Sequence, residues 1–234
     1  MSKKIIMACM AVAAFAAFVM PAAASATSPV LTHPTGTAYC PNGGTTANCL
    51  VLGTNVGDWV LKSSLGNITC SKVVLTGNIT KNKETHIQAD VTSATFNGTG
   101  VNGDCTAPAP LSNVRVTTTV GNGVPWCLTA GGTLAADEFT ARGNSCNLAQ
   151  RSITFVLDFT EGPTCYYNRT TTVKGTFKTH PEDAVLSFTE QEWTLEKGEN
   201  ETFFKPCLSS GKLTGSATLE TDVPGGVNEP MYIS

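Results

Sequence analysis

The residues with the most distinctive chemistry in this chain of 234 residues are its nine cysteines, eight of which lie between residues 40 and 207. No two of them form a Cys-x-x-Cys pair, the spacing that is typical of zinc sites and thioredoxin-like redox centres. An even number of cysteines in an exported chain instead indicates disulfide bonds. We therefore expect four disulfides, no metal site and no cofactor.

The order of these cysteines indicates how they pair. Hairpins bring the chain back beside its starting point, so cysteines that follow one another in sequence become neighbours in space. A hairpin that turns near Lys81-Asn82-Lys83 would return the chain beside Cys70 just before Cys105. The same reasoning predicts nearest-neighbour pairing throughout: Cys40 with Cys49, Cys70 with Cys105, Cys127 with Cys146, and Cys165 with Cys207.

Nucleophilic hydrolysis requires a nucleophile activated by a histidine. The sequence contains no Gly-x-Ser-x-Gly motif and three histidines: His33 precedes a proline, His86 begins an expected strand, and His180 lies in an expected turn. His180 and Asp183 could form a base with its orienting carboxylate. Because a turn histidine beside a carboxylate is commonly just solvated, we assign no catalytic residue and lean against an enzyme.

Paired carboxylates could instead serve glycoside hydrolysis, in which two groups flank one bond. Asp137-Glu138 and Glu182-Asp183 are the adjacent pairs. Adjacent residues of a strand point to opposite faces, so neither pair has the required geometry by itself. The alternative function that this leaves open is a secreted hydrolase whose carboxylate site is assembled from separate strands.

Two segments offer oxygen atoms that calcium prefers. In the first, seven acids are spread over three expected turns, which favours a solvated strand edge that resists aggregation: Glu182, Asp183, Glu190, Glu192, Glu196, Glu199 and Glu201. In the second, the glycine-rich segment 97–104 presents Asn102 and Asp104. That segment lacks a full repeat pattern, so we predict no calcium site from it.

Two further patterns bear on recognition at the surface. Five Asn-x-Ser/Thr sequons begin at Asn67, Asn78, Asn97, Asn168 and Asn200. We expect no sugars there, because the leader is typical of a bacterium and high Thr and Asn content produces such sequons without glycosylation. Tyr39, Tyr166 and Tyr167 lie near expected turns or cysteines, where aromatic side chains serve either as binding hot spots or as packing around a disulfide.

Residues 1–26 have the features of a cleaved signal peptide. Lys3 and Lys4 precede an apolar run from Ile5 to Met20, and a small-residue stretch ends at Ala26. We expect a secreted, extracellular protein, with a periplasmic or cell-surface location as the alternative. No second apolar run is long enough to span a bilayer, so we expect no membrane span in the mature chain.

The charge balance narrows the class of partner. The chain has 15 Lys and Arg against 18 Asp and Glu, and removal of Lys3 and Lys4 makes it more acidic. Nucleic acids and anionic membranes reward clustered positive charge, so neither is expected as the main partner. An extracellular carbohydrate or protein ligand remains, and the sequence leaves the oligomeric state open.

Alternating apolar residues predict an all-β fold. Threonine is the most abundant residue, with 35 copies, and disfavours helix. Period-two patterns run through 87–91, 114–120 and 153–159, whereas a helical stretch is expected only as one turn near 133–139. In the segment 184–196 the pattern changes parity, which predicts a bulge near Glu190-Gln191.

Three further expected strands, at 73–79, 173–177 and 213–219, carry a glycine on their apolar face. The gap left by the missing side chain requires a large cover, and Trp59, Trp126 and Trp193 are the natural candidates. Strand curvature or a bulge would explain the glycines equally well.

These patterns predict a disulfide-stapled antiparallel β-sandwich, with a closed β-barrel as the alternative. Residues 1–26 form the signal peptide, 27–56 a loosely ordered N-terminal arm with a small disulfide loop, and 57–234 a single all-β domain. The expected function is non-catalytic, a binding or structural role outside the cell. A module with an apolar cavity, or an inhibitor with a rigid loop, is a further possibility.

Overall fold

The computed structural model describes residues 30–41, 49–64, 66–83, 86–118, 124–131, 134, 137–178, 182–202, 206–222 and 227–234. The expected signal peptide, 1–26, lies outside these residues. The described chain is almost entirely β, and its paired strands are antiparallel; η2 (Val101–Gly103) is a short 3-10 turn between two of them. A search of these residues for a helix with the length and apolar character to cross a membrane finds none.

Sixteen strands are described. The first eight are β1 (Leu31–Thr32), β2 (Leu50–Asn55), β3 (Trp59–Ser63), β4 (Gly66–Cys70), β5 (Lys72–Lys83), β6 (His86–Asn97), β7 (Cys105–Thr106) and β8 (Asn113–Thr117). The second eight are β9 (Trp126–Gly131), β10 (Glu138–Gly143), β11 (Ile153–Phe159), β12 (Thr164–Arg169), β13 (Val173–Phe177), β14 (Val185–Glu199), β15 (Ser210–Thr221) and β16 (Tyr232–Ile233).

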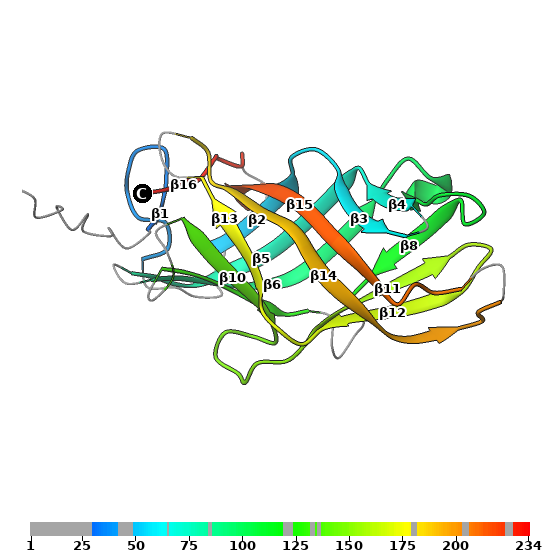
Figure 1. Cartoon of the computed structure of the whole chain (residues 1–234). Coiled ribbons are helices and arrows are strands. Elements are labelled where there is room, and N and C mark those ends of the chain that lie inside the picture. The colour runs from blue at the N-terminus through cyan, green and yellow to red at the C-terminus, as the bar shows by residue number, and fades with distance from the viewer. Residues whose placement is uncertain are drawn as a thin grey trace, which may run out of the picture.

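The strands form one large sheet and one small one. In the large sheet the hydrogen-bonded order is β10-β13-β14-β12-β11-β8-β7-β4-β3-β15-β2-β5-β6-β9, and β9 pairs with β10, so the order returns to its start. β14 and β15 cross in front of β5 and β6 in Figure 1, and side chains from all four strands line the same interior. The two-stranded sheet β1-β16 lies at one end of the large sheet.

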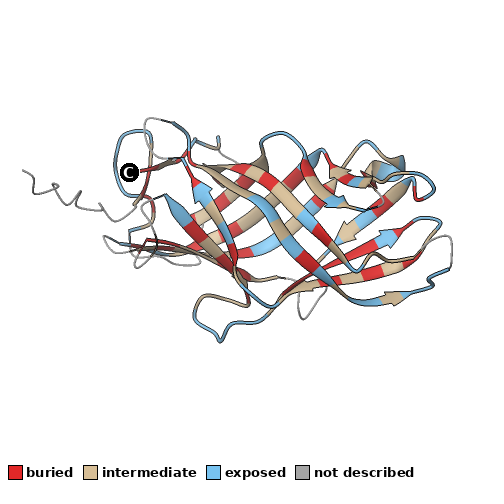
Figure 2. Ribbon diagram, in the orientation of Figure 1, coloured by how far each residue is buried: buried red, intermediate tan, exposed pale blue. Residues whose placement is uncertain are grey.

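Alternating side chains fill the space enclosed by the large sheet. In β6, Ile87 and Val91 are buried. In β11 the four predicted inward residues Ile153, Phe155, Leu157 and Phe159 are all buried, but so are Thr154 and Val156 of the opposite parity, so this strand is covered on both faces. Figure 2 shows the resulting stripes of buried and more exposed residues along the strands. The predicted 133–139 turn falls partly outside the described residues, and its end, Phe139, belongs to β10.

The expected register slip in β14 is confirmed. Pairing with β15 shifts between Phe188 and Gln191, and Glu190 there has a φ of 48°, in the left-handed region. The expectation that this acidic segment is a sheet edge is wrong, because β14 pairs with β15 on one side and with β12 and β13 on the other. Its acids are tolerated because they point to the solvated outer face.

Residues of the expected N-terminal arm are more ordered than the sequence predicts. β2 lies inside the large sheet, between β15 and β5, and β1 pairs with β16. The turn expected at residues 81–83 is also displaced, because β5 continues to Lys83. Asn82 explains the difference: its buried side chain exchanges hydrogen bonds with the backbone N–H and C=O of Leu31.

The four disulfides have the pairing expected from hairpin geometry: Cys40–Cys49, Cys70–Cys105, Cys127–Cys146 and Cys165–Cys207. Their sequence separations are 9, 35, 19 and 42 residues. The longest links join strands or loops that are distant in sequence, so they constrain the unfolded chain most strongly.

At each of the three inward-facing glycines, a different neighbour leaves no room for a side chain. A Cβ at Gly215 would lie 2.6 Å from the ring of Trp59, so this tryptophan is the predicted cover. At Gly175 the cover is Phe139 instead, whose ring would lie 2.5 Å from a Cβ. Gly77 lies at a register shift against β6, where a Cβ would meet the backbone of Asp90.

Candidate binding site inside the sheet

The most developed candidate site is a row of three adjoining cavities inside the large sheet. We call them the aromatic, central and aliphatic cavities, with volumes of about 40, 60 and 60 Å³. The aromatic and central cavities share Trp59, Phe155, Trp193 and Leu213 as lining residues. The central and aliphatic cavities share Leu75, Val91, Leu128, Phe139 and Leu186. A void of about 10–15 Å³ holds one water molecule, so each cavity is larger than the space for a single water.

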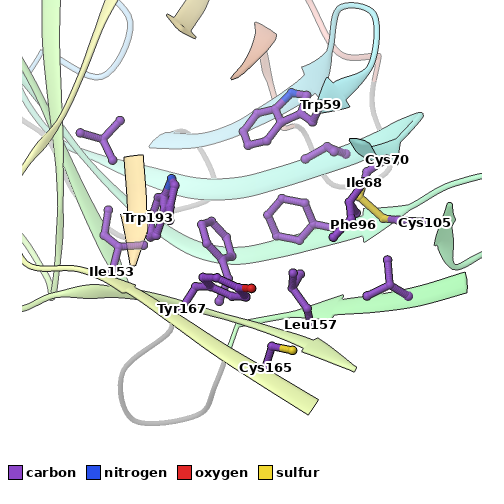
Figure 3. Close-up of a cluster of buried hydrophobic side chains, with 14 of the residues drawn as sticks. Trp59, Ile68, Cys70, Phe96, Cys105, Ile153, Leu157, Cys165, Tyr167 and Trp193 are labelled. Carbon is purple, nitrogen blue, oxygen red and sulfur yellow. A yellow bond between two sulfur atoms is a disulfide. The ribbon is translucent and has the colours of Figure 1, made fainter. Parts of the chain in front are cut away.

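Aromatic rings form much of the lining of the aromatic and central cavities. The Phe155 ring lies in the middle, with centroid distances of 5.5 Å to Phe96, 5.6 Å to Trp126 and 4.5 Å to Trp193. Trp59 makes an edge contact with Phe96 at 5.8 Å. Figure 3 shows Trp59, Phe96 and Trp193 projecting from different strands into this shared interior. The Trp59–Phe96, Phe96–Phe155 and Phe155–Trp126 pairs are edge-on, which is a favoured arrangement for aromatic rings, and the Phe155–Trp193 pair is tilted.

The three tryptophans differ in what their indole N–H groups do. Trp59 donates to the carbonyl oxygen of Ser216 at 2.9 Å. Within the described part of the chain, the N–H groups of Trp126 and Trp193 have no hydrogen-bond partner, although both side chains are more than nine-tenths buried. All three residues line the central cavity. An unpaired buried donor costs about 1–3 kcal/mol, so these two groups call for an explanation.

The aliphatic cavity is closed by both ends of the described chain. Leu31 of β1 and Ile233 of β16 belong to its lining, and both are almost fully buried. Asn82, which is 2% exposed, holds this end through Leu31 and through a hydrogen bond to the carbonyl oxygen of Tyr39. The Cys40–Cys49 disulfide ties the same segment to the residue before β2.

Two of the three tyrosines considered for surface recognition belong to the interior. Burial raises the pKa of Tyr39 to about 12, with a smaller contribution from the charge of Asp222. Burial also raises the pKa of Tyr167 to about 12, although its hydrogen bond to the Leu208 carbonyl opposes this. Both phenols are therefore packing groups with a satisfied hydroxyl.

Tyr166 is the one tyrosine of the three on the outer face. The ammonium of Lys197 lies 4.2 Å from the centre of its ring, and its hydroxyl donates to Glu199 at 3.3 Å. The hydrogen bond from Lys197 lowers the pKa of Glu199. This group is fully explained as a contact between β12 and β14.

The acids that could have formed a hydrolase site are dispersed on the outer face, and several face lysines. Glu182 pairs with Lys178 at 2.5 Å, and Glu190 lies 3.4 Å from Lys212. Asp183 borders a shallow open depression beside Glu182. Asp137 and Glu138 are exposed at the start of β10. The other candidate, His180, lies outside the described residues.

The glycine-rich segment 97–104 is closed by its own backbone. Gly100 donates to the carbonyl oxygen of Asp104 at 2.9 Å, and the Asp104 carboxylate lies 3.6 Å from Arg115. Asn102 has a φ of 61°, which the turn requires. Asp104 is thus engaged with a cation, while Asn102 remains exposed.

The remaining predicted positions are scattered. Asn67 and Asn200 are exposed, whereas the other sequon residues, Asn78, Asn97 and Asn168, are half-buried. His33 lies 3.4 Å from Glu229, which links the two ends of the described chain. Asp90 approaches Cys127 and Cys146, but these form a disulfide, and Asp90 accepts a hydrogen bond from the Cys146 backbone at 2.7 Å.

Sequence reasoning identified the tryptophans only as covers for glycines. It had no signal for the unpaired indole groups, because partnering depends on which carbonyl oxygens lie opposite each ring. The comparisons with known proteins add no assignment: no family model, no curated protein and no solved structure matches the chain.

Proposed function

We propose that this chain is an exported, non-catalytic protein that binds a small apolar ligand in the row of cavities inside its sheet. The observation that carries the proposal is the continuity of that row: three apolar cavities share walls along the enclosed interior. Ligand sites in proteins are concave and mostly apolar, with a few placed polar groups.

The architecture suits such a role. We propose that the cycle of strand pairings is a flattened barrel, in which two faces pack across the interior as in a sandwich and no long edge remains open. The four disulfides are compatible with an oxidising extracellular environment and with the export signal proposed for 1–26. A covalently braced shell would allow cavities to persist without collapse.

Quenching of tryptophan fluorescence tests the proposal. Bromine quenches indole fluorescence on contact, and all three tryptophans line the central cavity. We expect 1-bromobutane to quench the oxidised mature protein saturably, at concentrations below those that quench free tryptophan. Quenching that is linear in concentration and equal to that of free tryptophan would refute an interior site.

A cavity-filling variant supplies the structural control. Ala217 lines the central cavity and is 3% exposed, so Ala217→Leu places three further carbon atoms in it. We expect this variant to lose saturable quenching. The matched control is Thr218→Leu, the next residue of β15, whose side chain points to the opposite face. Equal quenching in both folded variants would contradict the proposal.

A further inference from the structure

We propose that residues 30–39 form a gate, that an apolar ligand enters the aliphatic cavity when this segment moves away from the large sheet, and that Asn82 is the latch that holds the gate closed. The inference rests on the proposed function, since it names the entrance to the same interior.

The gate is a small hairpin whose first strand forms part of the cavity wall. Thr32 pairs with Ala38 in an antiparallel bridge, and the Tyr39 N–H donates to the carbonyl oxygen of Leu31 at 2.8 Å. Leu31 lines the aliphatic cavity and is 1% exposed, whereas residues 34–38 of the hairpin are exposed. Outward movement of the hairpin would withdraw the Leu31 side chain from the wall and open the cavity to solvent.

Side chains, and not a backbone ladder, attach the gate to the large sheet. Among the described strands, β1 pairs only with β16. Asn82 of β5 accepts a hydrogen bond from the Leu31 N–H at 2.9 Å and donates to the carbonyl oxygens of Leu31 and Tyr39. The Tyr39 hydroxyl donates to the carbonyl oxygen of Leu50 at 2.5 Å. Release of the single side chain of Asn82 therefore breaks most of this polar attachment.

The segment that contains β16 is anchored to the large sheet by backbone hydrogen bonds. The Met231 N–H donates to the carbonyl oxygen of Leu219 at 3.1 Å, and the Thr221 N–H donates to that of Glu229 at 2.9 Å. The ladder between β1 and β16 is two residues long. The ion pair of His33 with Glu229 is partly exposed, and such pairs contribute little. We therefore expect β1 to move while β16 stays in place.

The opposite end of the interior, where β4 and β8 lie in Figure 1, is closed covalently. Cys70–Cys105 joins the end of β4 to the start of β7, and Cys165–Cys207 joins β12 to the segment before β15. The disulfide beside the gate, Cys40–Cys49, lies beyond Tyr39 and places no covalent link on β1. Because the strand order of the large sheet returns to its start, entry between its strands would break a ladder. The gate is thus the route that breaks the fewest strong contacts.

Rates of binding distinguish a gate from an ordinary part of the wall. The gate is closed in both the empty and the occupied protein, so its stability cancels from the Kd, while more frequent opening accelerates entry and exit equally. We expect Asn82→Ala to raise the association and dissociation rates of 1-bromobutane about 10- to 30-fold, with the Kd within about twofold of wild type. Tryptophan quenching after rapid mixing measures both rates in the oxidised mature protein.

The matched control is Asn78→Ala, which removes the same side chain from the same strand. Asn78 is half-buried, and it follows Gly77 and precedes Ile79, whose positions face the interior, so its side chain points to the outer face. Both rates should stay within about twofold of wild type.

A pair of tyrosine variants compares the two ends without removing a buried amide. Tyr39→Phe keeps the ring and removes the hydrogen bond to Leu50, so we expect both rates to rise about 3- to 10-fold. Tyr167→Phe removes the corresponding bond to Leu208 near the covalently closed end, where we expect no entrance.

Four outcomes would overturn the inference. The first is saturable quenching with the same rates in wild type, Asn82→Ala and Tyr39→Phe, which leaves the proposed function intact. The second is a weaker Kd in Asn82→Ala with no faster association, which would make Asn82 a support of the wall. The third is acceleration in Tyr167→Phe and not in Tyr39→Phe, which would place the entrance at the other end. The fourth, failure of 1-bromobutane to quench saturably, would overturn the proposed function as well.

Discussion

The two halves of the interior are built differently. The aromatic half, around Trp59, Phe96, Phe155 and Trp193, is packed by rings in mutual contact, and the Cys70–Cys105 and Cys165–Cys207 disulfides border it. The aliphatic half contains Tyr39, Phe139 and Phe177 but none of the three tryptophans, and its other side chains include Val51, Ile79 and Ile87. It is completed by Leu31, Met231 and Ile233, from the two ends of the described chain.

The difference shows two ways of closing an interior. Rings are large and rigid, so a few of them span the space between the two faces at the cost of gaps between their edges. The aliphatic half lacks the indoles, and residues 30–41 together with β16 close it; we call these two segments the plug. The first solution depends on strands within the large sheet, whereas the second depends on a segment held by Asn82 and one short disulfide loop.

The largest expected effect comes from removing one disulfide in each half. Chain-entropy estimates give about 4 kcal/mol for a loop of the length closed by Cys165–Cys207 and about 2.6 kcal/mol for the loop closed by Cys40–Cys49. We expect the double variant Cys165→Ser/Cys207→Ser to be the less stable of the two in urea unfolding. A larger loss from Cys40→Ser/Cys49→Ser would show that the plug contributes more than its loop length indicates.

Substitution of Asn82 should distinguish the local stabilities of the two halves more sharply, with a smaller loss in the free energy of unfolding. Asn82→Ala leaves the N–H and C=O of Leu31 without their partner, which costs about 2 kcal/mol. Because the lost bonds all hold one segment, we expect hydrogen exchange to accelerate across residues 30–41 while β11 remains protected.

The matched control for that substitution is Asn78→Ala on the same strand, a half-buried position. Its cost should stay within about 0.5 kcal/mol. If Asn82→Ala accelerated exchange equally in β11, the two halves would unfold as one unit and the comparison between them would lose its energetic meaning.

The sequence predicted the aromatic half better than the aliphatic one, for a physical reason. The alternation in 153–159 and the glycine opposite Trp59 are local patterns, and the predicted inward residues of β11 follow them, although Thr154 and Val156 of the opposite parity are buried as well. The same logic located the bulge at Glu190, since a change of parity needs an extra residue.

The plug was not predictable in this way. Lys81-Asn82-Lys83 has the composition of a turn, and only its burial against Leu31, 51 residues earlier, keeps Asn82 in a strand. Residues 30–41 contain no long alternating pattern, so their order follows from distant partners in β16. The unpaired indoles were hidden for the same reason, because hydrogen-bond partnering is a property of the assembled sheet.

The last expected effect appears only at alkaline pH and uses one tyrosine from each half. The pKa values of Tyr39 and Tyr167 are raised from 10.0 to about 12, so the folded state retains their protons after the unfolded state has lost them. The stabilisation is complete below pH 10 and is lost as the pH rises from 10 to about 12.

Tyrosinate absorbance and unfolding at several pH values would measure this dependence. We expect two of the four tyrosines to ionise only near pH 12, and Tyr39→Phe or Tyr167→Phe to remove one late step each. At neutral pH either variant should cost about 1 kcal/mol, because the carbonyl of Leu50 or Leu208 loses its donor. Since Tyr39 belongs to the plug, its ionisation should release residues 30–41 before β11 loses protection. Simultaneous release would show that the disulfide-braced shell, and not the plug, limits stability at both ends.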